Sequence, residues 1–86
     1  MGDDSEFVPR ATRIATLSLR LNDVPTGVEW LQRAVAASPN DARLLALLAD
    51  AQIKAGDRDG AKATIARGLE TDPANTALLA LGRRVR

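Results

Sequence analysis

The feature that most constrains this 86-residue chain is an internal repeat with a period of about 34 residues. Pro39 and Pro73 lie one period apart, and the same shift aligns Asp23 with Asp57. It also aligns the run Leu-Leu-Ala-Leu at 44–47 with an identical run at 78–81. Self-similarity at such a period is typical of arrays in which a small unit recurs and stacks on its neighbours.

The composition favours helices for these units. Ala and Leu dominate, aromatic residues make up 2% of the chain, and the bulky rings are limited to Phe7 and Trp30. β-Sheet proteins rely on β-branched and aromatic residues, whereas Ala, Leu and Arg lose little side-chain freedom in a helix. Clusters of Pro, Gly, Asn and Asp separate segments with helical spacing of apolar residues. We predict an all-α chain of five helices, at about residues 9–21, 26–37, 41–55, 59–71 and 75–85, packed as antiparallel hairpins because the connections are short.

The expected core consists of large aliphatic side chains on the apolar faces of these helices. They are Ile14, Leu17, Leu31, Leu45, Leu48, Ile65, Leu69 and Leu78. Residues 1–7 are mostly small or acidic, and we expect them to form a disordered or frayed tail.

Composition also excludes several functions. The absence of Cys and His removes disulfides, thiolate metal sites and the commonest general base. Twelve Lys and Arg against eleven Asp and Glu give a net charge of +1, too balanced to indicate nucleic-acid binding. No apolar run reaches the roughly 18 residues of a membrane helix, and no signal peptide is visible, so the cytoplasm is favoured while the location is left open. We expect no enzymatic activity, no catalytic residue, no cofactor and no metal. The excess of Arg over Lys suggests a bacterial coding bias.

Two acidic segments could be cation sites, but a simpler interpretation is favoured for each. Asp3, Asp4 and Glu6 cluster on the expected tail, where a solvated segment explains them. Residues 56–60 faintly resemble a calcium loop, but the bidentate Glu that ends such a loop is missing. A hairpin turn in which Asp57 caps the next helix accounts for these residues.

Two further features have two interpretations each. Arg83, Arg84 and Arg86 could form a patch for an anionic partner, but they also complement the negative end of the last helix, which is the favoured interpretation. Trp30 could anchor an interface, although packing at the N-terminal edge, with Phe7 or Val8, is favoured.

In its period and in its residues the chain resembles the tetratricopeptide repeat family, whose unit is a 34-residue helix–turn–helix. In the second repeat the signature positions hold Leu45, Leu48, Ala49, Gln52, Ala61, Ile65, Gly68 and Pro73. In the first repeat they hold Ala11, Ile14, Ala15, Ser18, Gly27, Leu31, Ala34 and Pro39. The large aromatic residues of the signature are missing, which suggests thinner packing.

This resemblance implies a short right-handed α-solenoid of stacked hairpins over residues 8–86. Residues 8–41 would form the first repeat and 42–75 the second. Residues 76–86 would be a capping helix or the first helix of a truncated third repeat.

The resemblance also places the first helix of each unit on an inner, concave wall, where residues one repeat apart stand side by side. The expected groove residues are Thr12, Thr16, Arg20, Arg43, Asp50, Ile53, Lys54 and Arg84. Arg20 beside Lys54 would favour an acidic stretch on the ligand. Family members that hold the acidic tails of heat-shock chaperones carry Lys and Asn where this chain has Thr12, Thr16 and Leu47, so that partner is not expected.

The function implied is therefore a non-catalytic module that binds a peptide or helix of another protein in its groove, as part of a larger protein or assembly. The alternative is a structural scaffold that oligomerises, for example as a homodimer, through apolar end faces. Leu78, Leu79 and Leu81 motivate this alternative.

Overall fold

The computed structural model describes residues 6–85, which form five α-helices and no strand. The helices are α1 (Phe7–Arg20), α2 (Val24–Ala37), α3 (Ala42–Lys54), α4 (Arg58–Thr71) and α5 (Thr76–Arg84). This confirms the prediction of an all-α chain with five helices, and each predicted helix end lies within two residues of the observed one. Of the predicted tail, residues 1–5 lie outside the described residues, and Phe7 begins α1.

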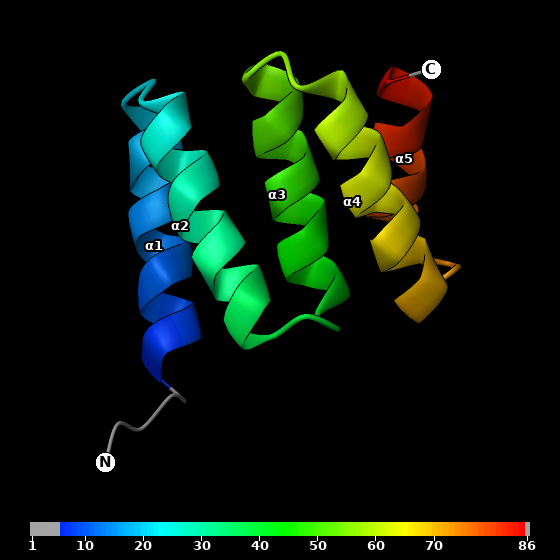
Figure 1. Cartoon of the computed structure of the whole chain (residues 1–86), viewed down its shortest axis with the longest axis horizontal. Helices are drawn as coiled ribbons and strands as arrows, with labels where there is room; N and C mark the ends of the chain where they lie inside the picture. The colour runs from blue at the N-terminus through cyan, green and yellow to red at the C-terminus, as the bar shows by residue number, and fades with distance from the viewer. Residues whose placement is uncertain (1–5, 86) are drawn as a thin grey trace.

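The helices lie side by side in chain order along the long axis of a molecule that measures 42 × 28 × 17 Å (Figure 1). Helix α1 packs antiparallel to α2, and α3 packs antiparallel to α4. Helix α2 joins the two hairpins by packing on α3, while α5 contacts both α3 and α4. Helices α1, α3 and α5 therefore run in the same direction, and their C-terminal ends lie at the same edge (Figure 1).

The α1–α2 turn and the α3–α4 turn have the same backbone geometry because they carry equivalent residues. The carboxylates of Asp23 and Asp57 accept hydrogen bonds from the backbone N–H groups of Thr26 and Gly60 and so cap α2 and α4. The residues just before these caps, Asn22 and Gly56, have φ of 65° and 82°. Asn and Gly adopt this left-handed conformation most readily. The Asp57 cap supports the interpretation of residues 56–60 as a hairpin turn.

The turns between hairpins also end in capping residues. The side chain of Asp41 accepts from the N–H groups of Arg43 and Leu44, and that of Asn75 accepts from Leu78 N. These caps start α3 and α5 one repeat apart and set the spacing of the array.

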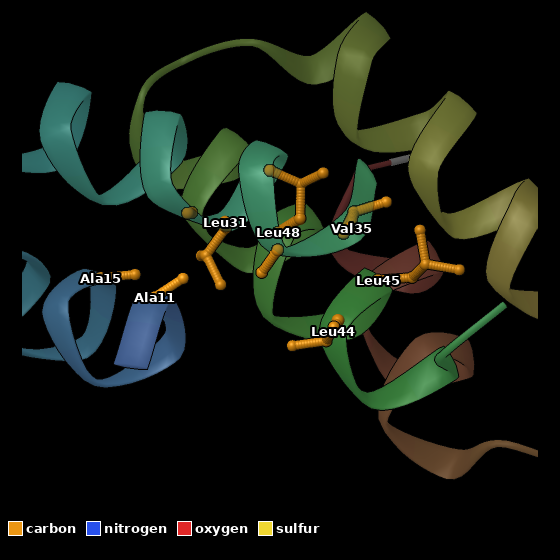
Figure 2. Close-up of a cluster of buried hydrophobic side chains, with 9 residues drawn as sticks. Ala11, Ala15, Leu31, Val35, Leu44, Leu45 and Leu48 are labelled. Atoms are coloured by element: carbon orange, nitrogen blue, oxygen red, sulfur yellow. The ribbon is translucent and has the colours of Figure 1, made fainter. Parts of the chain in front are cut away.

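Two clusters of buried side chains form the core, and α3 contributes to both. The first is built from side chains of α1, α2 and α3, most of which Figure 2 labels. Its members are Ala11, Ala15, Leu31, Ala34, Val35, Leu44, Leu45, Leu48 and Ala51. The second lies between α3, α4 and α5 and consists of Ala49, Ala61, Ile65, Leu78, Leu81 and Val85. Helix α3 is thus held by α2, and α5 by α4, the helices that precede them in the chain.

The predicted core is wrong at two positions on α1. Ile14 and Leu17 are 38% and 49% exposed, and Leu69 is only partly buried. The other five predicted residues are buried. Helix α1 contacts the core through Ala11 and Ala15, because its other side has no neighbouring helix within residues 6–85.

A buried polar pair lies inside the second hairpin. Gln52 and Thr64 are both buried, and Thr64 Oγ1 lies 2.7 Å from Gln52 Oε1, to which it can donate a hydrogen bond. Gln52 stands where the family signature has Tyr. The hydrogen bond offsets the cost of burying the two polar groups.

Candidate functional site

The inner helices bring residues one repeat apart into contact. Arg84 of α5 donates a hydrogen bond from Nη1 to Oδ1 of Asp50 on α3 over 3.3 Å. The two residues are 34 positions apart, so the expected side-by-side arrangement holds between these two helices. It arises because α3 and α5 are parallel and begin at equivalent caps.

A cleft of about 770 Å³ lies along this junction between α3 and α5. Its apolar centre is formed by alanines and leucines of both helices, with charged side chains around it and the 72–76 turn at one end. The lining residues are Arg43, Ala46, Leu47, Asp50, Asp72, Ala74, Asn75, Thr76, Ala77, Ala80, Leu81 and Arg84. Ala46 and Ala80, one repeat apart, leave the space that larger side chains would fill.

Asp50 links two cations at the rim of the cleft. Its Oδ2 lies 3.2 Å from Lys54 Nζ, and its Oδ1 lies 3.3 Å from Arg84 Nη1. All three side chains remain partly exposed to water, so each ion pair contributes about 0–1 kcal/mol to stability. One carboxylate shared between two cations leaves positive charge available at this rim.

Basic residues gather at one edge of the inner wall. Arg20, Lys54 and Arg84 occupy the last turns of α1, α3 and α5, whose C-terminal ends lie at the same edge. Arg83 lies in the same last turn of α5. Cations at these positions interact favourably with the negative ends of the helix dipoles, which gives them a structural role as well.

The cleft contains three of the eight predicted groove residues: Arg43, Asp50 and Arg84. Lys54 adjoins it through Asp50. Ile53 is partly buried and packs against the second core cluster.

The predicted groove residues on α1 do not line the cleft. Thr12 and Thr16 donate their hydroxyl groups to backbone carbonyls of their own helix, at Val8 and Thr12, and Arg20 is exposed. In the part of the chain that the structure describes, the cleft is therefore confined to α3, α5 and the turn before α5.

The sequence interpretation also missed lining residues. Leu47 and Leu81, again one repeat apart, were not among the candidates, and neither was the turn that carries Asp72 and Asn75. The repeat alignment could have paired the two leucines, but the position of the turn depends on how α5 folds back on α3.

The remaining candidate features have structural roles where they are described. Trp30 is partly buried against the first core cluster, which also has Val8 at its margin. The Arg33 guanidinium lies 4.7 Å from the centre of the Trp30 ring, and Arg33 also pairs with Glu29. Asp3, Asp4 and Arg86 lie outside the described residues.

Neither a metal centre nor a membrane span emerges between residues 6 and 85. There, His, Cys, Asp and Glu side chains form no group of three or more that could hold a metal ion. The helices in the same range fall short of the length and apolar character needed to cross a bilayer.

Stacked helical hairpins with a cleft along their inner helices define a helical-repeat protein. A family profile described as tetratricopeptide repeat matches residues 19–85, so the chain belongs to the tetratricopeptide repeat family. Comparisons with curated proteins and with solved structures gave no match. Tetratricopeptide repeats are generally protein–protein interaction modules and are typically non-catalytic.

Proposed function

We propose that the cleft between α3 and α5 binds a peptide or helical segment of another protein, and that the chain acts as a non-catalytic interaction module. The observation that carries this proposal is the cleft itself, an open space of about 770 Å³ with an apolar centre and a charged rim. Its volume falls within the range of about 300–1,000 Å³ that is usual for ligand sites.

The lining favours a ligand with an apolar residue flanked by acidic ones. Ala46 and Ala80 leave room for a side chain to enter, and Leu47 and Leu81 supply apolar surface around it. Arg43 and Arg84 lie on the same cleft and can each bind a carboxylate. Because each helix offers few contacts, an extended segment that follows the wall would gain more than a compact ligand.

The ion-pair arrangement favours an acidic ligand in particular. Lys54 and Arg84 carry two positive charges and share the single negative charge of Asp50. One positive charge is left over, and a carboxylate of the ligand can balance it. Arg20, at the same edge of the wall, adds to the positive potential.

A peptide-display experiment with a blocking variant tests the proposal. Ala80→Gln places a longer, neutral side chain in the cleft at an exposed position, and Ala63→Gln makes the same change on the exposed side of α4. Peptides selected on the parent should be rich in Asp, Glu and apolar residues. Ala80→Gln should weaken their binding about tenfold, while Ala63→Gln should leave it unchanged. Equal binding to all three proteins would show that the cleft is not the site.

The second candidate function is self-association through the C-terminal end. Of the three leucines that motivated it, Leu78 and Leu81 are buried, but Leu79 is 42% exposed. Leu79 lines a shallow pocket with Leu69 and Gly82, which a second copy could cover. Light scattering over a concentration series would detect this association, and Leu79→Gln should abolish it.

A further inference from the structure

One face of α1 corresponds, by the 34-residue repeat, to a face that is buried on α3 and on α5. A shift of one repeat aligns Ile14 with Leu48 and Leu17 with Ala51. Leu48 and Ala51 belong to the first core cluster, together with Leu31 of α2. Through this face α3 packs on α2. The next equivalent of Ala51, one repeat further along the chain, is Val85, which is buried beside α4.

On α1 the equivalent face is uncovered within residues 6–85. Phe7, Ile14, Leu17 and Leu21 are all exposed, and Leu21 is 80% exposed. Among the described residues, the exposed large hydrophobic side chains are these four and Leu79. Their spacing of seven, three and four residues places the four on one side of α1, in a single stripe. An exposed apolar stripe of this kind marks an interaction surface.

The charges around the stripe are mainly positive. Arg10 lies between Phe7 and Ile14 on the same side of the helix, and the exposed Arg13 and Arg20 lie along the edge nearer the inner wall. Glu6 pairs with Arg10 at 3.4 Å. A partner that carries carboxylates along one edge would complement these arginines.

We propose that this stripe is a docking site for an amphipathic helix of another protein, with apolar residues three and four positions apart and carboxylates along one edge. A helix is the expected occupant because α2 covers the equivalent face of α3, and α4 that of α5. Carboxylates are expected because Arg10, Arg13 and Arg20 border the stripe. A second copy of this face would offer arginines rather than a row of carboxylates, so it complements these charges less well.

This site is separate from the cleft of the proposed function. The cleft lies between α3 and α5, whereas the stripe lies on the side of α1 that faces away from the array. Arg20 lies near both surfaces, but Ala80 belongs to the cleft alone and Ile14 and Leu17 to the stripe alone, so variants at these positions test the two surfaces separately.

Binding of a designed helical peptide to the full chain tests the proposal. The probe has Leu at three- and four-residue spacing and Glu along one edge. One control peptide carries Lys in place of Glu, and another has the probe's composition in scrambled order. At low ionic strength the Glu peptide should bind about tenfold more tightly than the Lys peptide. The scrambled peptide should not bind.

Variants locate the binding on the chain. Ile14→Gln with Leu17→Gln should weaken binding of the Glu peptide about tenfold, while Leu79→Gln, which alters a similarly exposed leucine on α5, should have no effect.

The arginines beside the stripe are tested by charge reversal. Arg13→Glu should reduce the preference for the Glu peptide over the Lys peptide, whereas Arg67→Glu on the exposed side of α4 should not. Ala80→Gln should leave this binding unchanged, which separates it from the cleft. Leu21→Gln gives a second test if the double variant folds poorly, because Leu21 is almost fully exposed.

Two outcomes would overturn the proposal. The first is Glu-peptide binding that survives Ile14→Gln with Leu17→Gln and also Leu21→Gln. The second is a parent chain that sediments as a dimer and becomes monomeric in the Ile14→Gln, Leu17→Gln variant, because the occupant would then be a second copy.

Discussion

Gly68 on α4 lies directly against Leu78 on α5. A Cβ atom at position 68 would be 2.5 Å from Leu78 Cδ1 and 3.4 Å from Leu45 Cβ. Leu78 is fully buried and has little room to move. The small residue at position 68 therefore determines how closely α4 approaches α5. One repeat earlier, α2 has the buried Ala34 at the equivalent position.

Gly68→Val should destabilise the protein by about 1–3 kcal/mol, because overpacking at the α4–α5 contact outweighs the gain in helix propensity. Ala66→Val, on the exposed side of the same helix, should cost only the difference in helix propensity, about 0.5 kcal/mol. Urea denaturation followed by circular dichroism measures both. Equal stability of the two variants would mean that α4 and α5 do not meet at Gly68.

Leu48 and Ile14 occupy the same repeat position and should respond differently to truncation. Leu48→Ala removes a side chain that is 5% exposed and should cost about 2–5 kcal/mol. Ile14→Ala removes one that is 38% exposed and should cost less than about 1 kcal/mol. Thermal melts of the two variants compare them directly. A large loss for Ile14→Ala in the monomer would show that this face of α1 is covered.

The buried pair Gln52–Thr64 should behave cooperatively. Thr64→Val leaves Gln52 Oε1 without this donor and should cost about 1–3 kcal/mol. Adding Gln52→Leu should recover part of that loss, because both polar groups are then removed together. A double-mutant cycle measures the coupling. Additive effects of the two substitutions would show that the hydrogen bond contributes little.

The left-handed turn residue should tolerate Asn but not Ala. Gly56→Ala forces a Cβ into the conformation with φ of 82° and should cost about 1–2 kcal/mol, although no atom within 4 Å would clash with it. Gly56→Asn should cost less, because Asn22 adopts the equivalent conformation in the first hairpin. Chemical denaturation of the two variants tests this order.

Reversal of charge at the basic edge should affect binding more than stability. Arg20→Glu with Lys54→Glu removes the exposed Lys54–Asp50 ion pair and places acidic side chains at two helix C-terminal ends, so the free energy of unfolding should fall by about 1 kcal/mol while the chain stays folded. Affinity for an acidic peptide selected on the parent should fall by about 1–3 kcal/mol at low salt and by less at high salt. Unchanged affinity at low ionic strength would place the acidic ligand elsewhere.

The helices and their ends could be predicted because they depend on nearby residues. Asp23, Asp41, Asp57 and Asn75 cap the helices that follow them through hydrogen bonds to residues two or three positions away. The period was equally visible, and it predicts the Asp50–Arg84 contact as soon as the inner helices are taken to be parallel.

The candidate site was predicted less completely. The residues of α3 and α5 that line the cleft follow from the repeat alignment, but Thr12 and Thr16 satisfy their hydroxyl groups within α1 and lie outside it. The contribution of Asp72 and Asn75 depends on where the last turn meets α3, and no local pattern encodes that position.

The sequence by itself determined the repeating unit, the helices and their caps, because these arise from propensities and hydrogen bonds within a few residues of each other. Only the tertiary structure decided which apolar faces are covered. Ile14 and Leu48 stand at the same place in the repeat, yet Leu48 is buried and Ile14 is exposed. The reason is that burial depends on a neighbouring helix, and α3 has α2 on that side whereas α1 has no helix there within residues 6–85.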